Sequence, residues 1–447
     1  MRDLRAGAWL YMIALVSAAV FCDSGAVYAG ELRTEARPAA TATNRPMRQP
    51  QKLVLTVGQT EGDLRGKDDK VLQAGIGYLD RLGGGTLRIL PGVYTLRNAI
   101  HLRPNIILQG SGETTILRKA DGAVTALVRD SDWYEYGVQV KDPNGFTPGG
   151  GIMLRSKSGP GEWQYDVLRA TVTGIDGDVL FLDRLTRENF WLEKEATAAT
   201  IFPILTADEN IDDVQVRDLV LDGNRSRNEY INGNFAGAVF IQNCHRWRFS
   251  HVLARDYNGD GFSFQVCNDI AFQGCQAVNN AGLGFHPGSG SQRPVFRDCV
   301  ARGNNLGLFF CWSVSDGVAD RCTLSENKSF GISIGHRDTD NTIRDCIIER
   351  NGQVGILFRA EAGDFRCGHR NRIERCTIRD NGRENPGIGI DIQGKTEDIT
   401  ICNTRIENTA AGNQKTGVRI GREARRIVLE DNALTGSPTL VEDLRTR

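Results

Sequence analysis

The sequence predicts an all-β fold, a parallel β-solenoid, and three observations lead to this prediction. First, cysteines recur at intervals of roughly 24 residues, and an asparagine follows each in the same frame. Second, a glycine and a short alternating strand follow each asparagine, as in "GISIG" (331–335). Third, 51 glycines suit a protein of frequent turns better than a helical one. The repeated pairs are Cys275 with Asn280, Cys299 with Asn304, Cys322 with Asn327, Cys346 with Asn351, and Cys376 with Asn381.

Each fixed residue of the repeat has an expected role. Asparagine side chains stacked from coil to coil can bond to each other and to backbone groups that a tight bend would leave unpaired. The cysteines are expected to stack as small apolar thiols inside the coil, because the paired Cys-x2-Cys spacing of zinc sites is absent. The frame continues upstream at Leu219 and Asn224 and downstream at Asn403 and Asn408.

Two further cysteines lie outside this column. Cys244 and Cys267 each stand two residues after an aligned glutamine, so they occupy matching places on adjacent coils. Adjacent strands lie about 4.8 Å apart, which is within reach of disulfide geometry. A disulfide between them is therefore predicted, with stacked reduced thiols as the alternative.

The N-terminal segment predicts export. Two early arginines precede an apolar run from Ala8 to Phe21, and small residues end at Ala29. This run is too short to cross a membrane as a helix. Residues 1–29 are therefore predicted to be a signal peptide, with no transmembrane anchor, and the protein to be periplasmic, at the cell surface or extracellular. Residues 30–52 are predicted to be a disordered linker because they are rich in Pro, Ala and Thr.

The overall charge excludes one class of partner. The formal net charge is −1 at pH 7, so the chain lacks the basic footprint of a nucleic-acid-binding protein. The oligomeric state is left open by the sequence.

Residues 68–96, "DDKVLQAGIGYLDRLGGGTLRILPGVYTL", combine an amphipathic helix, a glycine turn and strands. Leu72, Ile76 and Leu79 share one face of this helix. The stretch resembles the N-terminal cap of right-handed parallel β-helix proteins of the pectate-lyase-like superfamily. The resemblance implies that the fold is a right-handed parallel β-helix and that the helix plugs the open end of the coil.

The same resemblance divides the chain. It implies a cap with the first coils over residues 53–124, a β-helix over 206–440 and a C-terminal tail over 441–447. The interruption at 125–205 contains "ATVTGIDGDVLFLDRL", a hairpin-like pattern that predicts a small inserted β subdomain. The superfamily includes polysaccharide lyases, hydrolases, epimerases and non-enzymatic binders, so it implies a carbohydrate-active protein without fixing the reaction.

Strand alternation predicts which side chains leave the coil. Residues one and three after the strand glycine are apolar and point inward, so residues two and four point outward. The outward positions, together with residues just beyond the strands, form a ladder that resembles a binding groove more than an ordinary sheet surface. Its predicted substrate-binding members are Gln242, Gln265, Trp312, Ser333, Asp391 and Asp260, and its predicted catalytic members are His336, Arg359, His286 and Glu361.

The stretch "GISIG", followed by "DNTIRD" and an arginine-bearing coil, resembles the polygalacturonase family of this superfamily. Those enzymes need paired aspartates one or two coils upstream, one as the acid and one to activate water. Here Asn305 and Leu306 stand where the pair is expected, and Asp260 is three coils away. The ladder therefore lacks the aspartate pair that catalyses hydrolysis in polygalacturonases.

The ladder fits β-elimination on a uronic-acid polymer better. That reaction needs a cation beside the sugar carboxylate and a base for the proton alpha to it. Arg359 offers a planar, two-pronged donor for the carboxylate, and His336 or His286 offers a base with a pKa near working pH. A polysaccharide lyase or related uronate-modifying enzyme is the leading prediction, with an acidic polysaccharide or oligosaccharide as its partner and no required cofactor.

Two other functions stay open. A glycoside hydrolase could use Glu361 with Asp338 or Asp340. A non-catalytic glycan-binding or surface protein would need no site chemistry at all. Asp338 and Asp340 are also candidate calcium ligands, although aspartates in "HRDTDN" are equally typical of turns.

Overall fold

The computed structural model describes residues 52–161, 164–361, 363–383, 385–409 and 412–445. The predicted signal peptide (1–29) and nearly all of the predicted linker (30–52) lie outside the described residues. Within the described ranges, no helix is both long and apolar enough to cross a membrane.

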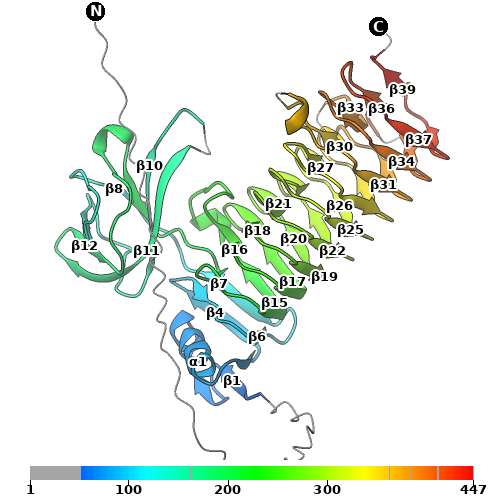
Figure 1. Ribbon diagram of the computed structural model, residues 1–447. Helices are drawn as coiled ribbons and strands as arrows, with labels where there is room; N and C mark the ends of the chain where they lie inside the picture. Colours follow the sequence, from blue (N-terminus) through cyan, green and yellow to red (C-terminus); the bar gives the residue numbers. More distant parts are fainter. Residues whose placement is uncertain (1–51, 162–163, 362, 384, 410–411, 446–447) are drawn as a thin grey trace, which may run out of the picture. The chain divides into compact units, whose positions relative to one another are not determined.

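The main body is a coil of short parallel strands arranged in three ladders (Figure 1). The first ladder contains β1 (Val54–Gly58), β2 (Leu64–Arg65), β3 (Gly85–Ile89), β6 (Ile106–Gln109), β15 (Gln215–Asp222), β17 (Arg248–Arg255), β19 (Ala271–Gln273), β22 (Val295–Arg297), β25 (Val318–Asp320), β28 (Thr342–Arg344), β31 (Arg372–Glu374), β34 (Thr400–Cys402) and β37 (Val428–Glu430). The second contains β4 (Gly92–Leu96), β7 (Thr115–Lys119), the C-terminal halves of β15 and β17, β20 (Gln276–Val278), β23 (Val300–Arg302), β26 (Thr323–Ser325), β29 (Ile347–Glu349), β32 (Thr377–Arg379), β35 (Arg405–Glu407) and β38 (Ala433–Thr435).

The third ladder is a separate eleven-stranded parallel sheet. It carries most of the residues predicted to form a site, and we call it the site sheet. Its strands, in spatial order, are β5 (Ile100–His101), β14 (Leu205–Thr206), β16 (Gly237–Gln242), β18 (Asp260–Gln265), β21 (Leu283–Pro287), β24 (Leu306–Phe309), β27 (Phe330–Ile334), β30 (Val354–Phe358), β33 (Gly387–Ile392), β36 (Gln414–Ile420) and β39 (Thr439–Asp443).

Apolar side chains from all three ladders fill the inside of the coil. Ile332, Ile334 and Ile356 are fully buried there, at the positions that alternation predicts. Aromatic rings stack from coil to coil in the same interior, as between Phe249 and Phe272 with centroids 4.9 Å apart. The dry interior explains how a chain of strands only two to eight residues long can be stable: each coil buries its apolar face against the next.

The asparagine column is a continuous hydrogen-bond ladder. The backbone N–H and the side-chain amide of Asn351 both donate to Oδ1 of Asn381, at 3.1 and 3.0 Å, and Asn327 donates to Asn351 in the same way. The ladder begins at Asn280 and ends where Asn381 donates to Oε1 of Gln414. The predicted continuation was wrong at Asn403, because the longer side chain of Gln414 takes the place after Asn381, but Asn408 does accept from the backbone N–H of Gln414, at 2.8 Å.

The cysteines are stacked and reduced. Every cysteine of the repeated column is buried, and the Cys322 backbone N–H lies 3.3 Å from the Cys346 sulfur. The predicted Cys244–Cys267 disulfide is wrong for this structure, in which both thiols are free. Each donates instead to the carbonyl oxygen two residues before it, at 3.2 and 3.1 Å, so the sulfurs face backbone acceptors.

Helix α1 (Asp69–Arg81) precedes the first full coil. The Asp68 side chain caps it by accepting from the N–H of Lys70. Leu72, Ile76 and Leu79 are fully buried in the same core as the coil. That this helix serves as the plug of the open coil end stays a prediction.

A six-stranded antiparallel sheet interrupts the coil (Figure 1). Its strands are β8 (Val124–Ala126), β13 (Thr197–Ala199), β10 (Gly151–Lys157), β11 (Tyr165–Asp176), β12 (Val179–Leu182) and β9 (Gly137–Gln139). The sheet has its own apolar core, which includes Leu154, Val172 and Leu180. Met153 and Phe202 instead join the core of the coil. Three short 3-10 helices complete the described elements: η1 (Leu192–Lys194), η2 (Arg225–Arg227) and η3 (Asp364–Arg366).

Candidate functional site

One column of residues runs along the site sheet and points away from the coil interior. Strand register aligns His101 with Thr206, Phe240, Ser263 and then His286. His286 thus pairs with Ser263 and not with Gln265, because Gly284, rather than Gly282, is the counterpart of the strand glycine Gly261. The column continues through Phe309, Ser333, Leu357, Asp391, Arg419 and Glu442.

Half of the predicted members of the ladder are covered. Gln265, Asp260, His286, Ser333 and Asp391 are buried, although alternation points all of them except Asp260 away from the core. Alternation gives the direction of a side chain but does not reveal the loops that cross above it. The carbonyl of Gly233, for example, accepts a hydrogen bond from the Ser263 hydroxyl. The expectation of an open groove along the whole ladder was therefore wrong.

His286 and Asp260 form a buried pair. Nδ1 of His286 lies 2.7 Å from Oδ2 of Asp260, and Oδ1 of Asp260 accepts from the N–H of Leu283. Burial alone would lower the pKa of His286, but the bond to Asp260, helped by the Cys311 thiol, raises it to about 10. A histidine that is protonated at neutral pH is a poor general base, which argues against the predicted role of His286 as the base.

A second cluster lies at the ends of β24, β27 and β30. Trp312 stacks on the ring of His336, with centroids 4.6 Å apart and planes 25° apart. Glu361 accepts from the backbone N–H of His336 at 3.0 Å, and its other oxygen lies 3.4 Å from the ring Nδ1. Trp312, His336 and Glu361 therefore stand together and partly exposed, as the sequence predicts.

Arg359 is held by protein acceptors. It donates to the Ser333 hydroxyl at 2.9 Å, the Phe310 carbonyl at 3.1 Å and Oδ2 of Asp338 at 3.0 Å, and its Nε lies 3.4 Å from Glu361. These contacts leave no two-pronged face for a sugar carboxylate. These contacts argue against the predicted role of Arg359 as the carboxylate clamp, because Ser333, Phe310 and Asp338 already occupy its donors.

The other candidate carboxylates are also taken by arginines. Asp340 forms a two-pronged pair with Arg370 at 2.8 Å, and Asp391 pairs with Arg419. Within the described residues, no three His, Cys, Asp or Glu side chains gather as a metal site would require. Asp338 and Asp340 thus do not form a calcium site with each other, and dependence on calcium stays a prediction.

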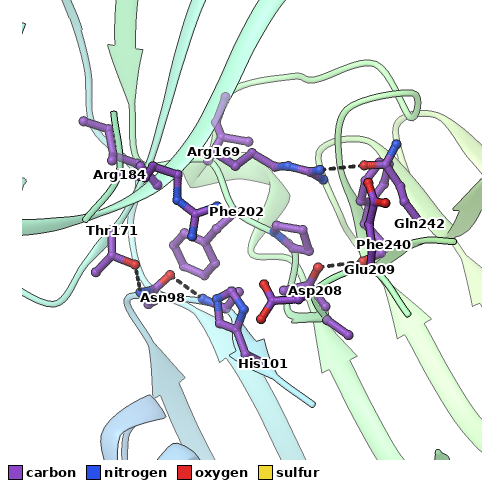
Figure 2. Close-up of a pocket in the computed structure, with 17 residues that line it drawn as sticks. Asn98, His101, Arg169, Thr171, Arg184, Phe202, Asp208, Glu209, Phe240 and Gln242 are labelled. Carbon is purple, nitrogen blue, oxygen red and sulfur yellow. Dashed lines mark hydrogen bonds between the residues drawn. The ribbon is translucent and has the colours of Figure 1, made fainter. Parts of the chain in front are cut away.

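A cavity on the site sheet lies elsewhere, where the inserted sheet meets β5, β14 and β16 (Figure 2). We call it the junction pocket. It has a volume of about 220 Å³. Of the sequence-predicted residues only Gln242 lines it. The polar lining comprises Asn98, His101, Arg169, Thr171, Arg184, Thr206, Asp208, Glu209 and Gln242, and Phe202 and Phe240 contribute aromatic walls.

Arg169, from β11, has no carboxylate partner among the described residues. It donates to the Phe235 carbonyl at 3.1 Å and to the Gln242 side-chain oxygen at 2.9 Å, and its guanidinium lies 4.2 Å from the centroid of the Phe240 ring. Burial, and then the positive charge of Arg184, lower the pKa of Arg169 to about 10, so it remains protonated at neutral pH. Two like charges thus converge on this pocket.

His101 ends β5 at the opposite side of the pocket from Arg169 (Figure 2). Its ring faces the Asp208 carboxylate and makes no hydrogen bond within the described part of the chain. Burial lowers the pKa of His101 below 6.5; Asp208 opposes this shift, and Arg184 and Arg103 reinforce it. The ring is therefore neutral at pH 7 and can accept a proton.

A wider cavity of about 590 Å³ adjoins the junction pocket. The two share His101, Arg184 and Asp208 in their walls, and the wider one extends to Lys70 and Gln73 of α1. A ligand at His101 therefore has room on two sides, as an internal unit of a polymer would need.

Comparison with known proteins supports the architecture. The family model described as the right handed beta helix region matches residues 237–366. The A-module of mannuronan C-5 epimerase AlgE4 from Azotobacter vinelandii superposes with a TM-score of 0.54 at 16% identity, over 84% of this chain and 93% of that one. A glycoside hydrolase superposes with a TM-score of 0.53 at 10% identity, over 85% and 96%. The chain folds as a right-handed parallel β-helix. No curated protein matches the sequence.

The β-helix explains why sequence reasoning missed the junction pocket. His101, Arg169 and Asp208 come from the first coils and the insertion, outside the regular repeat that the sequence frame follows. They meet only because β14 pairs with β5 after the insertion returns the chain to the coil. One signal was available: the insertion interrupts the β-helix beside two strands of the site sheet, and loops beside a rigid scaffold often carry function.

Proposed function

We propose that the protein is a carbohydrate-active enzyme that modifies uronate residues of an acidic polysaccharide, by β-elimination or a related reaction at the carbon alpha to the carboxylate. One observation carries the proposal. In the junction pocket, Arg169 and Arg184 converge and Arg169 lacks a carboxylate partner. An arginine in such a place is normally paired, so an anionic ligand would complete the pocket.

The residues of the pocket support this reaction class. The guanidinium groups of Arg169 and Arg184 would bind uronate carboxylates and stabilise the negative charge that builds up on proton removal. Neutral His101 would take the proton from C5. In elimination a double bond then forms between C4 and C5, the C4–O bond breaks, and His101 returns its proton to the departing oxygen. The two cavities around His101 would hold the sugar units on either side.

The fold is compatible with more than one outcome. Of the two superposed structures, one is named a mannuronan epimerase and the other a glycoside hydrolase, so uronate chemistry and hydrolysis both occur on this scaffold. The hydrolase alternative built on Glu361 with Asp338 has less support, because Asp338 is fully buried and bound to Arg359. Export is part of the proposal and rests on the N-terminal sequence.

The test is turnover on a panel of uronate polymers beside neutral polysaccharides. Ultraviolet absorbance of unsaturated uronate reports elimination, proton NMR of the polymer reports epimerisation, and reducing ends without absorbance report hydrolysis. We expect one of the first two signals, on acidic polymers alone. Hydrolysis, or turnover of neutral chains only, would overturn the proposal.

Variants then locate the site. Arg169→Met should lower kcat/KM by at least 100-fold, because removing a positioned charge partner costs several kcal/mol of transition-state stabilisation, on the order of 10² to 10³ in rate. Arg129→Met is the matched control, since Arg129 also belongs to the inserted region but is exposed, pairs with Glu135 and does not line the pocket. Equal activity of the two variants would place the site elsewhere.

A further inference from the structure

The side chain of Trp312 is unusually exposed for a tryptophan. Tryptophan is among the side chains most often largely buried, yet 51% of this one is open to solvent. Trp312 and Ser313 adopt φ values of 50° and 67°, the left-handed region that non-glycine residues rarely enter. The residues at the same place in earlier coils, Asn243 and Val266, have φ values of 47° and 53°, so the repeated turn itself sets the backbone conformation of Trp312.

His336 also holds the indole ring of Trp312 in place. One face packs on His336, and Glu361 fixes His336 through its backbone N–H and ring nitrogen. Glu361 in turn contacts Arg359, which is tied to the fully buried Asp338. Three strands thus supply one rigid assembly: a flat indole ring beside a partly exposed carboxylate and imidazole.

This assembly shares a sheet with the junction pocket. Phe240, in the pocket wall, stands on β16, and Trp312 follows β24, three strand spacings further along the site sheet. Three spacings amount to about 14 Å. A pyranose ring linked in a chain spans a length comparable to one spacing, so about three sugar units separate the two places.

We propose that Trp312, His336 and Glu361 form a second saccharide subsite, which binds the same acidic polysaccharide chain about three sugar units away from the junction pocket. This inference rests on the proposed function and deepens it: the substrate is a polymer that reaches both places, passing over the loop that covers Ser263 on β18. The apolar face of a pyranose would stack on the indole, and its hydroxyl groups would bond to Glu361 and His336. The role of Arg359 and Asp338 is to hold these groups in position.

The test uses oligomers of increasing length from the polymer that the panel identifies. Wild-type kcat/KM should rise with length and level off once a chain reaches from the pocket to Trp312. Trp312→Ala should reduce the preference for long over short oligomers by about tenfold, the worth of one aromatic contact. Trp312→Phe, which keeps an aromatic face, should restore most of it. Phe365→Ala is the control, because Phe365, in η3, is even more exposed than Trp312 and makes no ring contact with a histidine among the described residues.

Direct binding separates this inference from the proposed function. Tryptophan fluorescence of the full protein is titrated with the long oligomer in wild type and in Trp312→Phe. A signal change present in wild type and lost in the variant supports the subsite even if turnover is absent, in which case the proposed reaction alone has failed. The same length preference in wild type and Trp312→Ala, with Arg169→Met inactive, would overturn the subsite and leave the proposed function standing.

Discussion

The basic residues along the site sheet differ mainly in whether a buried carboxylate of the protein already pairs with them. His286 and Arg359 face buried carboxylates of their own protein, Asp260 and Asp338. Arg169 and His101 have no such partner within the described residues. His286 and Arg359 therefore have structural roles, whereas Arg169 and His101 are available to bind a ligand. The sequence favoured His286 and Arg359 because residue type and spacing do not reveal which charges are already satisfied.

At the residue scale, the pH dependence of turnover should report His101. The base is active when neutral, and burial lowers its pKa below 6.5. Activity should therefore rise with pH in the acid range and level off before neutrality, as measured by kcat/KM. Asp208→Asn removes a charge that raises this pKa, so it should move the acid limb to still lower pH. An acid limb above pH 7 would mean that another group is the base.

The Arg359–Asp338 pair makes a prediction about stability. Arg359→Met leaves a fully buried carboxylate without its partner and should destabilise by about 3–5 kcal/mol in urea melts. Burial raises the pKa of Asp338 from 3.8 to about 7, so the folded protein binds this proton more tightly than the unfolded chain. Stability should therefore fall as pH rises from about 4 to 7, and more steeply in the variant. Adding Asp338→Asn should recover most of the loss; no recovery would show that the pair is not the cause.

At the element scale, the sequence predicted the repeated coils and missed the covering loops and the junction with the inserted sheet. The cysteine and asparagine frame located the coils between Cys275 and Asn381, since each coil meets the same packing demands as the next. It failed at Gln414, where the spacing lengthens, and at His286, where Gly284 rather than Gly282 is the counterpart of Gly261. The site sheet could be predicted as a surface, but not its covering loops or its junction with the inserted sheet, because these depend on contacts between distant segments.

Asn351 tests the ladder itself. It is fully buried and bonded to Asn327, Asn381 and the Leu324 carbonyl. Asn351→Ala should destabilise by about 1–3 kcal/mol, because it leaves buried donors and acceptors unpaired. The measurement is a thermal or denaturant melt. The exposed asparagine Asn305 in a neighbouring turn offers a control, Asn305→Ala, which should change the melt little; equal effects would show that the column has no special role.

At the scale of the whole molecule, the β-helix provides the site sheet. The inserted sheet adds the junction pocket at the N-terminal end of that sheet. If the chain is exported as its first residues predict, the mature protein should begin near Gly30, directly after the small residues that end at Ala29. N-terminal sequencing of the protein recovered from outside the cytoplasm checks this. Recovery of the full-length chain from the cytoplasm alone would contradict it.

The asparagine ladder also has a direction. From Asn280 to Asn381 every side-chain amide donates forward to the side-chain oxygen of the next coil and back to a backbone carbonyl of the preceding coil. The links between side chains therefore all run the same way, so the amide dipoles add head to tail and can polarise one another. A chain of this kind has two unlike ends, and only the ends need special residues: Tyr257 supplies the first donor and Gln414 the last acceptor. A duplicated coil placed in the middle would add one more identical link, whereas one placed after Gln414 would need a new terminus. Growth of this protein by gene duplication should therefore be tolerated in the interior of the ladder and resisted at its ends.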